Sequence, residues 1–153
     1  MSDSRSWALV SARVKSTEAT RSTAFVRKGQ FVVGRPLTFD REDPETSAME
    51  YLAAAVAADV SGTLRKAARE RRVEIDELEV VAQGELDNAL MFLGVIGEEG
   101  EPSLKSLSLK IYLSTDAEES AVRAVWDIAR ERSPLFTTLR RSVDLQVDLQ
   151  ISH

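Results

Sequence analysis

The feature that most constrains this fold is a long helix-forming segment, residues 47–72, which is apolar on nearly every side in its first half. Ser47 and Glu50 have the spacing of a capping box, in which each side chain accepts a hydrogen bond from the backbone amide of the other. A helix that is apolar all round has to be buried. Because a chain of 153 residues rarely surrounds such a helix alone, we predict a homodimer whose second copy supplies the missing wall.

Segments with strand character lie on both sides of this helix. Those before it predict a small antiparallel meander with a turn at 28–29, and most of those after it alternate between apolar and polar residues. The predicted strands are residues 7–14, 23–26, 31–33, 36–39, 78–86, 88–96, 107–113 and 143–151.

Two shorter helices are expected between the last two strands. Asp116 has the position of an N-cap for the first of them, which ends before Pro134. Ser133-Pro134 then reads as the N-cap and first residue of a second short helix. The succession of strands, long helix, strands, helix pair and strand predicts an α+β fold in a single domain, residues 1–153.

The residues that the chain lacks exclude several kinds of chemistry. It has no cysteine, so disulfides, thiolate nucleophiles and thiolate metal sites are excluded. Its one histidine is the last residue, which excludes an internal histidine base and a Ser-His-Asp triad. The adjacent Asp87 and Asn88 indicate a turn, and we predict neither a metal site nor a cofactor.

The charge balance and hydropathy bear on partners and location. Twenty basic and 25 acidic residues leave a net charge of −5, which argues against general affinity for nucleic acid. The polar start of the sequence does not resemble a signal peptide, and the longest apolar run, residues 51–58, is too short to span a bilayer. We therefore expect a cytoplasmic protein with no membrane partner.

Three segments follow one another with a distinctive spacing. They are SAMEYLAAAVAADVSGTLR at 47–65, the strand that ends in GELD at 84–87, and ARERSPLFTTLR at 129–140. In this order they resemble the OsmC family of hydroperoxide-handling proteins, whose members typically have a PxELLxAAxxxC helix, a GxLD strand end and a CPxxxTL segment. The resemblance extends from about Trp7 to Ile151.

The resemblance implies a fold and also a loss of activity. It implies the OsmC-like fold, with N-terminal antiparallel strands, a long buried central helix, further strands, a helix pair and a C-terminal strand, in an intertwined homodimer with pockets at the subunit interface. In the family, one thiolate attacks the peroxide and a second resolves the sulfenic acid as a disulfide. Asp59 stands at the first cysteine position and Ser133 at the second. We therefore expect hydroperoxide reductase activity to be absent.

The resemblance also suggests residues around that position. Glu50 matches a helix-start glutamate that, in peroxidase members, helps to hold an arginine near the reactive thiol. Arg21, Arg27 and Arg35 all lie in the region where this arginine should be, and Arg21 is the candidate that we carry forward. The sequence leaves the choice among the three open.

Each candidate site residue also has a purely structural interpretation. Asp59 lies midway along a helix expected to be buried, where a carboxylate must be paired, hydrogen-bonded, protonated or at a pocket wall. It is either the structural partner of an arginine or a pocket carboxylate. Ser133 either caps the short helix or lines a small anion site there, and Glu50 belongs to the capping box, holds an arginine, or does both. The basic residues of 65–72 form either a solvated helix end or a basic patch.

The resulting hypothesis is a homodimeric OsmC-like protein without thiol peroxidase activity. It binds a small apolar or amphipathic ligand in an interface pocket, with Asp59, Ser133, Glu50 and Arg21 as ligand contacts. One alternative is a cysteine-independent enzyme that uses Asp59 as an acid or base. The others are a structural or partner-binding protein, and a peroxidase that depends on thiols supplied by a partner.

Overall fold

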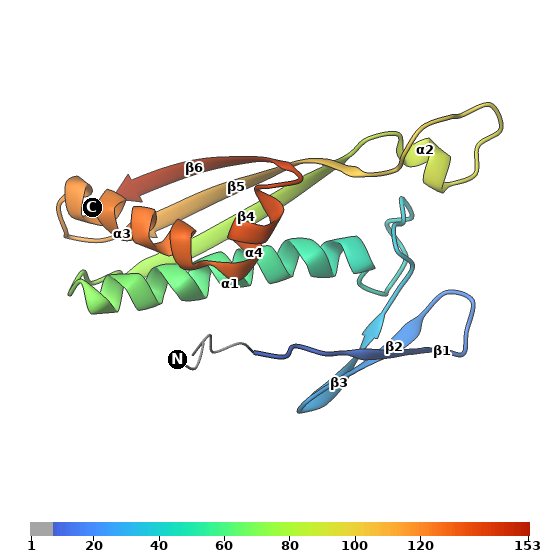
Figure 1. The fold of residues 1–153 in the computed structure, drawn as a ribbon, viewed down its shortest axis with the longest axis horizontal. Coiled ribbons are helices and arrows are strands. Elements are labelled where there is room, and N and C mark those ends of the chain that lie inside the picture. The colour runs from blue at the N-terminus through green and yellow to red at the C-terminus, as the bar shows by residue number, and fades with distance from the viewer. Residues whose placement is uncertain (1–7) are drawn as a thin grey trace, which may run out of the picture. The chain divides into compact units, whose positions relative to one another are not determined.

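A computed structural model describes residues 8–153 and shows an α+β fold with two three-stranded sheets (Figure 1). The chain divides into two compact units, one up to Tyr51 and one from Leu52 onward. The helix α1, Ala48–Glu70, begins in the first unit and continues in the second. The single domain over 1–153 stays a prediction.

The first unit contains the predicted antiparallel meander. Its strands are β1 (Arg13–Ser16), β2 (Ser22–Val26) and β3 (Gly29–Val33), in the order β1-β2-β3. The turn between β2 and β3 lies at residues 27–28, one position before the one predicted, with Val26 paired to Gly29. The first predicted strand is displaced, because β1 begins at Arg13, and Trp7 lies outside the described residues.

The predicted strand at 36–39 is wrong, because this segment is the start of a loop. Gly34 donates its backbone N–H to Thr46 O at 2.8 Å, which closes the loop that connects β3 to α1. The backbone carbonyls of Arg35 and Pro36 accept hydrogen bonds from Ala48 N and Met49 N, at 3.3 and 3.2 Å. The segment therefore satisfies amides at the start of α1, groups that a helix cannot satisfy internally.

The second unit contains a mixed sheet. Its strands are β4 (Glu77–Leu86), β5 (Leu104–Ser114) and β6 (Asp144–Ser152) in the order β4-β5-β6, with β5 antiparallel to β4 and parallel to β6. A parallel neighbour requires a crossover connection. The helix pair α3 (Glu119–Arg132) and α4 (Pro134–Leu139) makes that connection.

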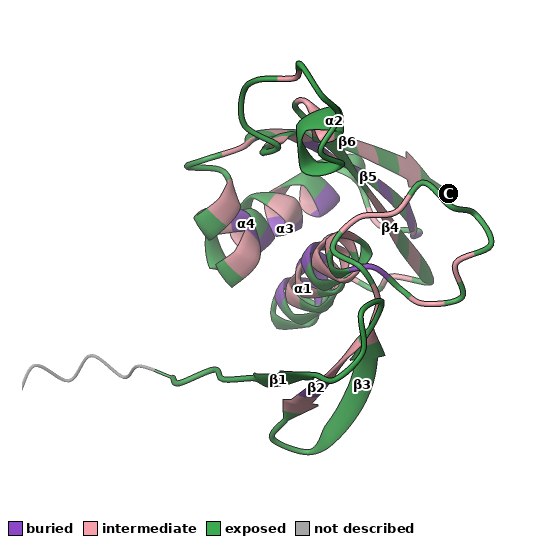
Figure 2. Cartoon of the chain, turned by 90° about the vertical axis from the view of Figure 1, so that its right-hand side faces the viewer, coloured by how far each residue is buried: buried purple, intermediate pink, exposed green. Residues whose placement is uncertain are grey.

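The core lies between this sheet and its helices. The alternation of β5 buries Leu107, Leu109, Ile111 and Leu113 on one face, as predicted. Helices α1 and α3 cover that face with a set of small and branched side chains, namely Val56, Val60, Leu64, Ala67, Ala68, Val122, Val125 and Ala129. Figure 2 shows the buried positions on these elements. In the single chain, Ala54, Ala55 and Ala58 on α1 remain exposed.

The apolar segment 88–96 forms a short helix rather than the predicted strand. Asn88 adopts a left-handed conformation with φ 39°, and its side chain accepts a hydrogen bond from Met91 N, which begins α2 (Ala89–Phe92). Gly94 and Gly97 have φ of 70° and 91°, values that interrupt an extended strand. The prediction failed because hydropathy alone does not separate a short strand from a short helix.

The predicted N-cap at Asp116 is also wrong. Helix α3 begins at Glu119, and the residue at its N-cap position, Glu118, makes no side-chain capping bond. Ala117 N instead donates to the hydroxyl of the buried Thr115, at 3.0 Å. Within the described residues, no helix combines the length and the apolarity needed to cross a membrane.

Candidate functional site

The structure brings together Asp59 and Ser133, two predicted site residues that are 74 positions apart in the sequence. Asp59 lies in the middle of α1 and is half-buried, and Ser133 is 1% exposed between α3 and α4. The Ser133 hydroxyl donates a hydrogen bond to Asp59 Oδ2. The same oxygen accepts a hydrogen bond from Leu135 N, at 3.0 Å.

These contacts account for every backbone amide in the first turn of α4. Pro134 occupies the first helical position and has no N–H. Leu135 N, the second, donates to Asp59, and Phe136 N, the third, donates to Ser133 Oγ at 3.3 Å. Thr137 N continues the helix by donating to Ser133 O at 3.0 Å. Ser133 is therefore the predicted N-cap, and Asp59 is a second, long-range cap.

The contacts of Asp59 differ from the predicted pairing with an arginine. Its partners in the described chain are a hydroxyl and a backbone amide rather than an arginine. A carboxylate near a helix N-terminus is also favoured by the helix dipole. Both bonds reach Oδ2, while Oδ1 accepts none from residues 8–153 and is not sealed from solvent. One oxygen of Asp59 therefore caps α4, and the other makes no hydrogen bond within residues 8–153.

Glu50 forms the capping box that the sequence predicts. Ser47 N donates to Glu50 Oε2 at 2.7 Å, and Glu50 N donates to Ser47 Oγ at 3.1 Å. The bond from the Ser47 amide, followed by that from its side chain, lowers the pKa of Glu50 below its ordinary value. The predicted contact between Glu50 and an arginine is not among the hydrogen bonds of the described residues, so the capping interpretation holds.

The three candidate arginines lie in the first unit. Arg21 forms a two-pronged ion pair with Glu18, at 2.9 and 3.1 Å, and a longer one with Glu45 at 3.4 Å. The hydrogen bond and charge of Glu18 raise the pKa of Arg21. Arg27 is exposed in the turn between β2 and β3. Arg35 lines, with Arg21, a shallow depression of about 320 Å³ that is otherwise largely acidic.

The sequence did not indicate the Leu135 amide as part of this site. A backbone donor leaves no residue-type signal, although Pro134 at the first helical position does mark its neighbours as helix-start amides. Within residues 8–153, no group of three or more acidic or histidine side chains is arranged to hold a metal ion. The arrangement can accept and donate hydrogen bonds, but it contains no thiol for reversible oxidation.

A family model described as OsmC-like protein matches residues 41–148, about two thirds of the chain. The chain belongs to the OsmC family. Several solved structures share this fold over nearly the whole chain. The OsmC-like protein of Mycoplasma pneumoniae has a TM-score of 0.81 at 16% identity, covering 95% of this chain and 99% of that one. No curated protein matches the sequence significantly.

Two further similar structures carry names that refer to organic hydroperoxide resistance. OhrB of Bacillus subtilis has a TM-score of 0.64 at 21% identity, covering 94% of this chain and 100% of that one. The organic hydroperoxide resistance protein OsmC of Legionella pneumophila has a TM-score of 0.66 at 15% identity, covering 94% of this chain and 99% of that one. At these identities the likeness shows the fold alone. Within that fold, this OsmC-family chain has no cysteine.

Proposed function

We propose that this OsmC-family protein is a cytoplasmic homodimer that binds a small apolar or amphipathic ligand and does not act as a thiol peroxidase. The observation that carries the proposal is the Asp59–Ser133 hydrogen bond, formed between the positions at which the family motifs have cysteines. A carboxylate and a hydroxyl cannot pass through the sulfenic acid and disulfide steps that thiols use. Their contacts are those of a helix cap.

Exposed apolar side chains support the dimer and the binding role. In the second unit, a continuous stretch around α2 exposes Leu90, Met91, Phe92, Leu93, Val95 and Ile96. In the first unit, Phe31 and Val32 on β3 are also exposed. Contiguous apolar surface on a single chain is typical of interaction or ligand sites. This surface favours coverage by a second copy and leaves room for an apolar ligand.

The open oxygen of Asp59 supports the choice of an amphipathic ligand. Oδ1 accepts no hydrogen bond from residues 8–153, while Ala55, one turn earlier on the same helix, and Ala58 are exposed and apolar. A ligand with one hydroxyl or amine and an apolar body suits such a wall. Asp59 and Ser133 are the proposed contacts in the second unit, and Glu50 and Arg21 stay predicted contacts in the first.

Native mass spectrometry of gently purified protein tests the proposal. We expect a dimer mass with a reproducible additional mass, which is lost or reduced in Asp59→Asn. Asp127→Asn, which removes an exposed charge on α3, is the matched control and should keep the additional mass. A clean monomer would contradict the dimer. A dimer without additional mass would favour a structural or partner-binding protein instead.

A hydroperoxide assay tests the absence of peroxidase activity. With dithiothreitol as reductant, we expect cumene hydroperoxide consumption no faster than in a control without protein. The double variant Asp59→Cys/Ser133→Cys places thiols at two side chains that are in hydrogen-bond contact, so we expect an intrachain disulfide on mild oxidation. Consumption by the unaltered protein above that of the control would refute the proposal. It would mean that the protein promotes peroxide reduction with thiols that come from dithiothreitol or a partner.

A further inference from the structure

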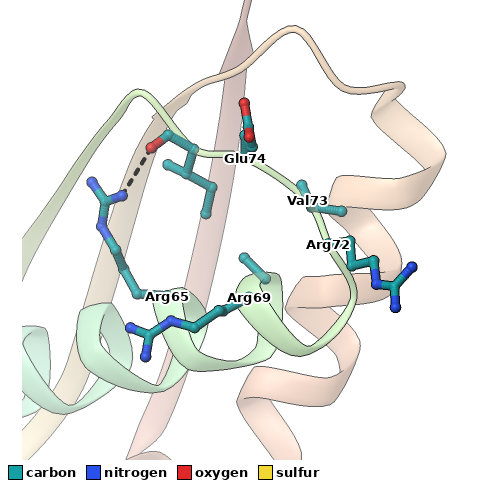
Figure 3. A pocket seen from close by; sticks show the side chains of 7 residues that line it. Arg65, Arg69, Arg72, Val73 and Glu74 are labelled. Carbon is teal, nitrogen blue, oxygen red and sulfur yellow. Dashed lines mark hydrogen bonds between the residues drawn. The ribbon is translucent and has the colours of Figure 1, made fainter.

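The C-terminal end of α1 borders an open cavity of about 350 Å³, whose lining includes neither Asp59 nor Ser133. Its walls come from the last turns of α1 and from residues 73–75, where the chain returns beside the helix (Figure 3). Arg65 and Arg69, one helical turn apart, both line it. The cavity thus combines two cationic side chains with a wall made by one short connection.

Backbone hydrogen bonds hold this connection in place. Val73 N donates to Ala68 O at 2.9 Å, and Arg72 N donates to Arg69 O at 3.2 Å. This pair of bonds defines a Schellman motif, with Arg72 in the left-handed position at φ 58°. Because the motif sets the direction of the chain after the helix, the wall of the cavity is formed before any ligand binds.

Arg65 joins the two walls and keeps donors for a ligand. Its Nη1 donates to the backbone carbonyl of Ile75 at 2.8 Å. A guanidinium group has five N–H donors, so this one bond leaves the remainder of its donors available. Figure 3 shows the side chains of Arg65 and Arg69 extending in the same direction along the helix, whereas Arg72 extends the opposite way.

Arg65 also lines a depression with Asp76, Glu77 and Glu79, yet those carboxylates do not form ion pairs with Arg65 or Arg69. Neither arginine forms an ion pair within residues 8–153, whereas Arg123, Arg130 and Arg132 on α3 each do. Glu74 borders the cavity, but its side chain points away from the helix (Figure 3). The negative end of the helix dipole offsets part of this positive charge. An oxyanion held between two guanidinium groups would still gain charge-assisted hydrogen bonds.

The rest of the lining is apolar and limits the kind of anion. Ala68 is buried, and Val73 and Ile75 are half-buried and pack against the core. A fully hydrated inorganic ion would make no apolar contact with these side chains. An anion with a short apolar group can place its oxygens on the arginines and its apolar part against Val73 and Ile75.

We propose that this cavity binds a small organic oxyanion, a phosphate monoester or a carboxylate. Arg65 and Arg69 hold its oxygens, and Val73 and Ile75 contact its apolar group. The proposal concerns residues other than those of the proposed interface pocket, so either one can fail while the other stands.

Titration followed by backbone amide NMR tests this site. The probes are phenyl phosphate, benzoate and the neutral benzyl alcohol, read at the amides of residues 65–75. We expect saturable shifts there with one or both anions and none with the alcohol. Tighter binding of phenyl phosphate would identify a phosphate monoester as the ligand class, and tighter binding of benzoate would identify a carboxylate.

Two variants distinguish a specific anion site from nonspecific electrostatic attraction of anions to the protein. Arg69→Gln removes one guanidinium without breaking the Arg65 contact to Ile75, and we expect it to weaken anion binding about five- to tenfold. Arg71→Gln makes the same charge change at an exposed neighbour that does not line the cavity, and should change binding less than twofold. Equal weakening by the two variants, shifts with the alcohol equal to those with the anions, or no saturable shift would each overturn the proposal.

Discussion

Helices α1 and α4 both begin with a buried serine and a carboxylate, but the two carboxylates come from different places in the sequence. At α1, Glu50 is three residues after Ser47, and the two residues exchange hydrogen bonds within one turn. At α4, the carboxylate is Asp59, 74 residues before Ser133 and on another helix. The first cap therefore needs only the local helix, whereas the second forms only when α1 and α4 are packed together.

Because of this difference, we expect the two caps to contribute differently to the free energy of unfolding. A local capping box stabilises the start of its own helix. The Asp59 contact also ties the middle of the long helix to the crossover connection between β5 and β6. We therefore expect substitutions at Asp59 to cost more than substitutions at Ser47 or Glu50, although all of these residues cap helices.

The largest effect is expected for Asp59→Ala. It removes the acceptor for Leu135 N and for the hydroxyl of the buried Ser133, so we expect the free energy of unfolding to fall by about 2 kcal/mol. Urea denaturation at neutral pH measures it. Asp127→Ala, which breaks an exposed ion pair with Arg130, is the control and should change stability by about 0.5 kcal/mol or less. Equal effects of the two substitutions would show that the Asp59 contacts contribute no more to stability than an exposed ion pair.

The second prediction concerns coupling between Asp59 and Ser133. Ser133→Ala alone should lower the free energy of unfolding by about 1.5 kcal/mol, because Phe136 N loses its acceptor. The double variant should lose about 1 kcal/mol less than the sum of the single losses, since one hydrogen bond is removed in both. A double-mutant cycle from the same urea curves measures this. Additive losses would mean that the two side chains act independently.

A smaller loss is expected at the local cap. Ser47→Ala removes the acceptor for Glu50 N and should lower the free energy of unfolding by about 1 kcal/mol. Thr46→Ala, at the exposed neighbouring position, should change it by about 0.5 kcal/mol or less. A loss at Ser47 as large as that at Asp59 would show that the local cap also supports tertiary packing.

The smallest effect concerns the pH dependence of Glu50. Its pKa is lowered in the folded protein, so its contribution to stability is present above the ordinary value of 4.5 and is lost as the pH falls through the lowered value. Glu50→Gln should therefore destabilise the protein slightly at pH 7 and have less effect at pH 3. Urea midpoints at both pH values test this, with Glu42→Gln at an exposed position as control. The same pH dependence in both variants would contradict the prediction.

Much of the fold was predictable because it depends on local patterns. The alternation in β5 and β6 identifies their buried faces, and the capping box marks the start of α1. The segments that failed lack such patterns. The apolar run at 88–96 contains no decisive period, and its helix depends on the left-handed Asn88 and on glycines in positive-φ conformations.

The candidate site was predictable in part. Ser133 before Pro134 indicated an N-cap from the sequence alone, and the structure confirms it. Asp59 was expected to need a partner. The structural partner that we predicted was an arginine, whereas the observed partner is the start of helix α4. A backbone amide carries no sequence signal, so this contact could not be read from residue types.

The sequence by itself determined the long helix α1, the strands β4, β5 and β6, the start of α4 and the absence of thiol chemistry, because these follow from local spacing and composition. Only the tertiary structure decided that Asp59 caps α4, that β6 lies parallel to β5, and that Arg65 and Arg69 border one cavity with residues 73–75. The physical reason is that a hydrogen bond or strand pairing between distant segments depends on how the helices and the sheet pack. Local sequence patterns do not specify which distant segments come into contact.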